Sequence, residues 1–223
     1  MEREHKSSCL ATGTLAKRGP TRSMRHKFVI GALVACLAEV SIHGSGALQR
    51  GAVKSPGPPV PYEDVGACPF EGCVYREWIA NAQVDVRSGR RPNDPIAYTL
   101  RAGDRVQALT GIVVTIKPGR VQFKAQADLG SSSGAVHVEP GETLYLLTYH
   151  GEGETTAWFK GRLYDWLDGS EFFNALCEDQ PASCNGSIVE RPQRVWWVRL
   201  RNLRGRLGWS RETEKFDNKD ALG

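Results

Sequence analysis

The chain has 223 residues, which allows one large domain or two small ones. Its formal net charge is +4, but residues 1–47 hold seven of the 29 Lys and Arg and only three of the 25 Asp and Glu. Residues 48–223 therefore carry equal numbers of basic and acidic side chains. Because a nucleic-acid-binding domain usually has a basic surface, we expect no nucleic-acid partner.

Residues 1–47 have the layout of a leader with a signal peptide. A basic segment begins at Met24, which is a possible true start of the protein, and an apolar run follows at residues 28–38. Small residues precede Ala47 and mark a plausible cleavage site. The run is shorter than the ~20 apolar residues of a membrane span. An uncleaved anchor is the alternative.

Cys36 offers another route to the same compartment. Residues 33–36, Leu-Val-Ala-Cys, resemble the lipobox of bacterial lipoproteins, in which the cysteine is acylated. Cleavage at Ala47 is favoured over this lipidation. Both routes predict that the body is exported, to the periplasm or beyond the cell, and meets a membrane only through its leader or a lipid anchor.

The body keeps four cysteines, Cys68, Cys73, Cys177 and Cys184. An even number of cysteines in an exported chain predicts disulfides, and three pairings are open. Four and six residues separate the members of the two close pairs, and no histidine lies near either pair. Because structural zinc sites usually have closer spacing, we expect neither a metal nor another cofactor.

The chain then alternates between turns and strand-like segments. Residues 48–66 are proline-rich and predict a linker. Period-two alternation and β-branched residues predict strands at 74–80, 84–87, 98–100, 105–109, 112–116 and 157–164. Residues 165–190 form a polar insertion in which only 171–176 suit a short helix. With no amphipathic helix of ordinary length, the predicted fold class is mainly β.

A tryptophan hairpin at residues 196–209 closes this series. Trp196 alternates with Trp197, so the two side chains point to opposite faces of a strand. We assign Trp196, together with Trp209, to the core, because Trp196 shares its side with apolar residues. Trp197, Arg199 and Arg201 then form an outward face and are the candidate ligand-binding residues.

Residues 100–110 align without a gap with residues 138–148. Gly103 matches Gly141, and an acidic residue follows each glycine. This predicts two turns of structural importance. The match indicates either an internal repeat or a coincidence between two turn-strand segments.

Three segments, at residues 84–88, 98–106 and 196–209, occur in this order and together resemble the bacterial SH3-like (SH3b) domain. The resemblance implies small, partly open barrels of five strands that bind cell-wall peptide, glycan or protein without catalysis. The long spacing before the last segment favours two such domains, at 67–128 and 135–216, with the insertion 165–190 in the second and a tail at 217–223. A single barrel with a long insertion is the alternative.

Catalytic motifs are lacking in the body. Its only histidines, His137 and His150, lie in no metal-binding motif, and there is no nucleophile elbow or phosphate-binding loop. Cys68 and His150 could form a nucleophile and base, but a disulfide is favoured. We therefore expect a non-catalytic binding module of the bacterial cell envelope, with a wall component or envelope protein as partner. The alternatives are an assembly protein and, more remotely, an unrecognised hydrolase.

Overall fold

The computed structural model describes residues 56–173, residue 177 and residues 179–222. The predicted signal segment, the candidate acylation site Cys36 and the start of the proline-rich linker lie outside the described residues. Within them the fold is mainly β, as predicted, and the helical elements are short. None of the helices in this part of the chain is long and apolar enough to cross a membrane.

Two stretches distant in sequence form the flanking unit, residues 56–117 and 193–222. Its sheet has the strand order β15-β2-β5-β13-β14-β3-β4, and β1 also pairs with β5. The strands are β1 (Tyr62–Val65), β2 (Glu77–Ala80), β3 (Val84–Arg87), β4 (Ile96–Leu100), β5 (Arg105–Lys117), β13 (Gln193–Asn202), β14 (Leu207–Ser210) and β15 (Phe216–Asp217). A 3-10 turn, η2 (Thr213–Lys215), precedes β15.

The residues between β5 and β13 form the inserted unit, residues 118–192. Its main sheet has the order β11-β10-β9-β6-β12, and β7 and β8 form a separate hairpin. The elements are β6 (Gly119–Phe123), β7 (Ala127–Leu129), β8 (Val136–Val138), β9 (Thr143–Gly151), β10 (Glu154–Phe159), β11 (Arg162–Asp168), α1 (Ser170–Phe173), η1 (Pro181–Ser183) and β12 (Gly186–Glu190).

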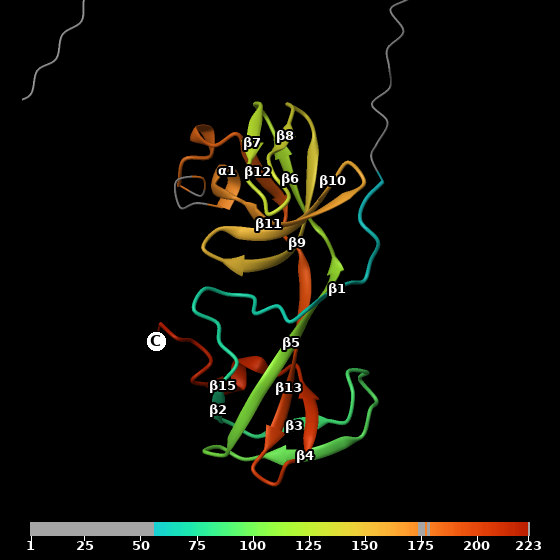
Figure 1. Cartoon of the computed structure of the whole chain (residues 1–223), viewed down its shortest axis with the longest axis vertical. Helices are drawn as coiled ribbons and strands as arrows, with labels where there is room; N and C mark the ends of the chain where they lie inside the picture. The colour runs from blue at the N-terminus through green and yellow to red at the C-terminus, as the bar shows by residue number, and fades with distance from the viewer. Residues whose placement is uncertain (1–55, 174–176, 178, 223) are drawn as a thin grey trace, which may run out of the picture. The chain divides into compact units, whose positions relative to one another are not determined.

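The long strand β5 organises the flanking sheet. The sequence predicted separate strands at 105–109 and 112–116, whereas Thr110 and Gly111 continue one strand of 13 residues. Its β-branched residues suit a central strand. β13 pairs with it from Gln193 opposite Lys117 to Asn202 opposite Val106. In Figure 1, β5 and β13 run side by side, and the sheet curls from them through β14 to β3 and β4.

The two units share one strand scheme. The order of five strands is the same in both sheets. In the flanking sheet it is β15-β2-β5-β13-β14, and in the inserted sheet the corresponding order is β12-β6-β9-β10-β11. The hairpin β3–β4 then corresponds to β7–β8. The chain order also agrees, because the inserted unit stands between β5 and β13, whose counterparts β9 and β10 are joined directly.

Strand registers follow the same correspondence. Val84 lies opposite Leu100 in one unit, and Ala127 lies opposite Val138 in the other. Val106 faces Trp78 on β2, as its counterpart Leu144 faces Val121 on β6. Leu100 and Val106 align with Val138 and Leu144 in the sequence match, so the match reflects a structural repeat.

The two glycine turns of this repeat are also equivalent. Gly103 and Gly141 have φ values of 91° and 84°, in the left-handed region that favours glycine. The Gly103 amide donates to the Ala80 carbonyl at 2.7 Å, and the Gly141 amide donates to the Phe123 carbonyl at 2.7 Å. Both glycines are exposed, so they act through the turns, as their pattern in the sequence predicted, and they do not belong to the hydrophobic core.

Strand pairing crosses the domain limits expected from the sequence. The ranges 67–128 and 135–216 do not coincide with the two sheets, because β13 of the second range pairs with β5 of the first. The expected linker 48–66 includes β1, and the expected insertion 165–190 includes α1 and β12. The expected strand 157–164 is interrupted by a turn between β10 and β11.

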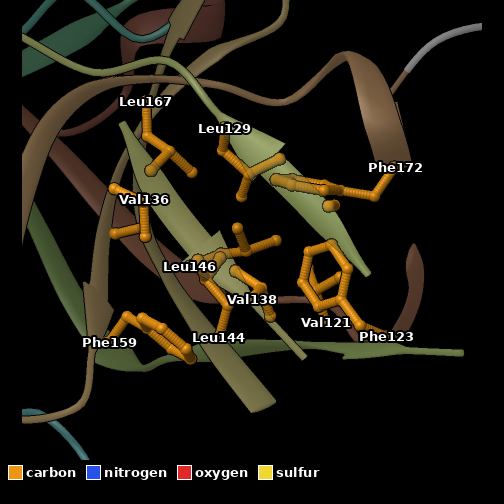
Figure 2. Close-up of a cluster of buried hydrophobic side chains, with 12 residues drawn as sticks. Val121, Phe123, Leu129, Val136, Val138, Leu144, Leu146, Phe159, Leu167 and Phe172 are labelled. Carbon is orange, nitrogen blue, oxygen red and sulfur yellow. The ribbon is translucent and has the colours of Figure 1, made fainter. Parts of the chain in front are cut away.

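Each unit has a separate core. The flanking core consists of Trp78, Ala80, Val84, Val86, Tyr98, Leu100, Val106, Ala108, Val198, Leu200 and Phe216. In the inserted unit, side chains from the sheet, the β7–β8 hairpin and α1 point toward one another (Figure 2). They are Val121, Phe123, Ala127, Leu129, Val136, Val138, Leu144, Leu146, Ala157, Phe159, Leu167 and Phe172.

Candidate functional site

A cleft of about 900 Å3 lies where β1 and the loop after it face strands β9 to β11. We call it the β1 cleft. Its lining combines aromatic, hydroxyl and carboxylate side chains, notably Tyr62, Asp64, His150, Thr156, Asp165 and Trp166. A concave site with a few convergent polar groups is the usual form of a ligand-binding site.

β1 supplies one wall of the cleft. It pairs antiparallel with β5, with Asp64 opposite Val113. Because successive side chains of a strand alternate, Tyr62 and Asp64 share one face and are partly buried, while Glu63 and Val65 are exposed. Glu63 is paired with Arg90 through two hydrogen bonds of 3.0 and 2.9 Å.

The loop closed by the Cys68–Cys73 disulfide extends this wall. It approaches the end of β9 so closely that a Cβ on Gly151 would lie 2.9 Å from the Cα of Glu71. Phe70 in the same loop packs edge-on against Trp196, with ring centroids 5.9 Å apart. The loop is therefore held against both units.

Tyr75 and Trp196 tie the loop to the flanking sheet. The indole N–H of Trp196 donates to the Tyr75 hydroxyl at 3.1 Å, and that hydroxyl donates to the carbonyl of Ala67. Burial raises the pKa of Tyr75 to about 12, so the hydroxyl keeps the proton that this bond needs. Trp196 thus positions a wall of the cleft from outside the cleft.

His150 is at the centre of the polar lining, and its side chain is only 10% exposed. Its Nε2 lies 2.8 Å from Thr156 Oγ1 and 3.7 Å from Asp64 Oδ2. The Thr156 hydroxyl donates to Asp165 Oδ1 at 3.3 Å, so Thr156 accepts the bond from the Nε2–H of His150. This chain of bonds orients side chains, and the proton of Thr156 is directed to Asp165 and away from His150.

Asp64 has an unused acceptor. Its Oδ2 is buried and has no hydrogen-bond partner among the described residues. Burial raises the pKa of the nearby Tyr62 to about 12, and the charges of Asp64 and Asp165 add to the rise. The local field is therefore negative. A buried acceptor without a partner is costly, so a ligand that donates a hydrogen bond there would relieve this cost.

Trp166 presents an aromatic ring at the cleft. Its φ of 52° is in the left-handed region, which is unusual for a bulky residue and is often found at binding sites. The ring stacks on His150, with ring centroids 4.6 Å apart. Trp166 as a whole is 52% exposed. The strand therefore places an accessible indole beside two carboxylates.

No family model, no curated protein and no solved structure matches this chain. The interpretation of the site therefore depends on its own geometry.

The tryptophan hairpin differs from the predicted binding face. Trp197 does point away from Val198 and Leu200, but it is only 7% exposed. Arg211, which follows β14, lies over its ring at 6.0 Å. This corrects its assignment as a solvent-facing ligand contact, because residues beyond the hairpin cover it.

Other residues of the hairpin are accessible to different degrees. Arg199 and Arg201 are exposed, as expected for an outward face. Trp196 and Trp209 are half-buried. Trp196 packs 5.7 Å from Trp78 of the flanking core, and Trp209 lies beneath the guanidinium of Arg90 at 5.7 Å. A small pocket of about 120 Å3 adjoins Trp197 and Trp209.

The four body cysteines form two local disulfides. Cys68 pairs with Cys73 and Cys177 pairs with Cys184, which is one of the three pairings left open by the sequence. In the described part of the chain, no three His, Cys, Asp or Glu side chains are arranged to hold a metal ion.

The β1 cleft was not predicted from the sequence. The sequence placed Asp64 in an expected linker and Asp165 at the start of the expected polar insertion, and it suggested His150 only as a possible base for Cys68. The left-handed backbone of Trp166 leaves no clear trace in the sequence. These residues come from β1 in the flanking sheet and from β9, β10 and β11 in the inserted sheet, so only the tertiary fold brings them together.

Proposed function

We propose that this protein is an exported, non-catalytic binding module of the bacterial cell envelope, and that the β1 cleft holds its ligand. The observation that carries the proposal is the half-exposed indole of Trp166 beside the unpartnered carboxylate oxygen of Asp64. An aromatic face with nearby acceptors suits a wall glycan or peptide, because the ring provides stacking area and the acceptors provide direction.

Export is supported by the disulfides. Two intramolecular disulfides are typical of proteins that fold in an oxidising compartment, and cytosolic proteins rarely keep them. The curled flanking sheet is compatible with the SH3-like domain that the sequence resembles. We propose the periplasm or cell surface as the location, with the leader providing the export signal.

Binding to purified cell-wall sacculi tests this function. The full chain should sediment with sacculi, and Trp166→Ala should reduce the bound fraction at least fivefold. Trp209→Ala is the matched control, because this tryptophan lies at the small hairpin pocket and outside the cleft. Thermal melts of both variants would establish that the folded fraction is unchanged.

The opposite result would reject the cleft as the binding site. If Trp209→Ala abolishes binding and Trp166→Ala does not, the hairpin binds the wall. If the wild-type chain sediments with sacculi no better than a protein of equal size and charge, wall binding is wrong. Recovery of a single envelope protein in place of sacculi would then favour the assembly role.

A further inference from the structure

The charge of the β1 cleft restricts the chemical class of ligand that it can bind. Three acidic side chains, Glu63, Asp64 and Asp165, line the cleft, and no Lys or Arg among the described residues lines it. Arg90 neutralises Glu63 from outside. Neither Asp64 nor Asp165 forms a salt bridge with a Lys or Arg among the described residues. Apart from His150, whose Nε2 is hydrogen-bonded to Thr156 and lies 3.7 Å from Asp64 Oδ2, no basic side chain among the described residues offsets the negative charge of Asp64 and Asp165.

Burial of Asp64 strengthens the interactions that its charge can make. The Asp64 side chain is 18% exposed, and its Oδ2 is buried without a hydrogen bond. Interactions of a charge are stronger where water is excluded than at an open surface. An anionic ligand would be repelled here. A neutral hydroxyl could satisfy the free oxygen but would leave the charge unbalanced.

An aromatic surface lies next to these carboxylates. The Trp166 ring is stacked on His150, and the indole face is a favourable site for a cation. Asp165 is adjacent to Trp166 in the chain and lines the same cleft. One group with several N–H donors and a positive charge would match both the carboxylates and the ring.

We infer that the β1 cleft binds a ligand through a primary ammonium group, which contacts Asp64 and Asp165 while the body of the ligand packs against Trp166. This rests on the proposed binding function and narrows its ligand. In envelope material, such a group occurs on de-N-acetylated amino sugars and on the side chains of diamino acids in peptides. Charge-assisted hydrogen bonds to carboxylates are stronger than neutral ones, so the free amine should dominate recognition.

Calorimetric titration of the full chain with four probes tests the inference. Two are glucosamine oligomers and their fully N-acetylated counterparts, and two are Nα-acetylated trilysine and the same peptide with its side-chain amines also acetylated. We expect a free-amine probe to bind at least tenfold more tightly than its acetylated counterpart. The sugar and peptide pairs distinguish the two sources of the amine. This comparison uses only the wild-type protein.

Charge-removing variants then locate the contact. Asp64→Asn and Asp165→Asn should each weaken binding of the free-amine probe at least fivefold. Asp128→Asn is the matched control, because it removes one carboxylate on β7 that does not line the cleft, and it should leave affinity unchanged. Equal weakening by all three variants would show a general charge effect and overturn the inference.

Two further outcomes would also overturn it. Equal affinity for acetylated and free-amine probes would show that the ammonium group is not recognised. Absence of binding by both free-amine probes would have the same consequence. The sacculus assay remains an independent measure. If the wild-type chain sediments with sacculi and Trp166→Ala does not, the proposed function is retained and only the ammonium ligand is rejected.

Discussion

Trp196 links the flanking sheet to the disulfide loop, since its ring contacts Phe70 on the loop and Trp78 in the core. Trp196→Ala would remove both contacts and the hydrogen bond to Tyr75. Truncation of a large aromatic side chain in a core costs about 3–5 kcal/mol, and a half-buried one should cost somewhat less. We expect a clear fall in melting temperature. A melt within one degree of wild type would contradict this role.

Trp197→Ala tests the covered position of the second tryptophan. Because Trp197 is 7% exposed beneath Arg211, we expect this variant to lose stability as well, by roughly 3–5 kcal/mol in denaturant unfolding. Arg199→Ala, next along the strand and exposed, provides the control and should change stability little. If Trp197→Ala unfolds like the control, its ring is free for a ligand after all.

His137 provides a measurable pH effect at a single residue. Its Nδ1 lies 2.7 Å from Asp128 Oδ1, and its Nε2 lies 2.8 Å from Glu139 Oε1. Hydrogen bonds to these two carboxylates raise the pKa of His137 above 6.5. Because the pKa of His137 is higher in the folded protein than in the unfolded chain, these two interactions stabilise the fold below pH 6.5. This stabilisation is lost as the pH rises through the pKa of the folded protein.

An NMR titration of the imidazole protons would measure this directly. We expect a midpoint above 6.5 in the wild type, and Asp128→Asn should lower it because one carboxylate is lost. An identical midpoint in the two proteins would show that Asp128 does not hold the imidazolium. The site is exposed, so the effect on overall stability should be small.

At the scale of elements, the repeated Gly-acid turns allow a paired test. Gly103→Ala and Gly141→Ala each place a Cβ on a left-handed residue, which costs about 1–2 kcal/mol. The two losses should be similar, because the turns share the same hydrogen bonds. Gly130→Ala is a control with no contact to a Cβ closer than 3.9 Å. Unequal losses would show that the two turns are not energetically equivalent.

The Cys68–Cys73 loop connects an element to the function of the cleft. Cys68→Ser combined with Cys73→Ser should destabilise the protein by about 2 kcal/mol, as expected for a short closed loop. The same variant should weaken ligand binding, because the loop forms a wall of the β1 cleft. Cys177→Ser with Cys184→Ser is the matched control and should keep binding, since those residues do not line the cleft.

Thiol labelling of the wild type is the corresponding chemical test. Unreduced, denatured protein should show no free thiol among the four body cysteines. Labelling of all four would reject both disulfides and would make the loop unsuitable as a rigid wall.

At the scale of the whole molecule, the separate cores predict separable folding. The core of the inserted unit contains residues from 121 to 172 only, and the flanking core contains none of them. β5 and β13 pair at Lys117 and Gln193, so the ends of the inserted unit emerge side by side. We expect residues 118–192 alone to give a cooperative thermal transition and dispersed NMR signals. A non-cooperative melt would show that the unit depends on the flanking sheet.

Local sequence was sufficient for a large part of the secondary structure. Period-two alternation located β3, and the Gly-acid match located the turns before β5 and β9. The same alternation placed Trp196 on the same side of its strand as Val198, because it determines which side chains share a face. These features depend on neighbours in the chain, so the sequence alone could predict them.

The tertiary structure decided which strands pair and which faces are covered. β13 pairs with β5 although the whole inserted unit separates them, and alternation contains no information about such a distant partner. Trp197 is buried with Arg211 over its ring, and the β1 cleft joins Asp64 to His150 and Asp165, all from segments that meet only after folding. Periodicity specifies a face of a strand, whereas burial of that face and assembly of a site depend on the long-range contacts that complete the fold.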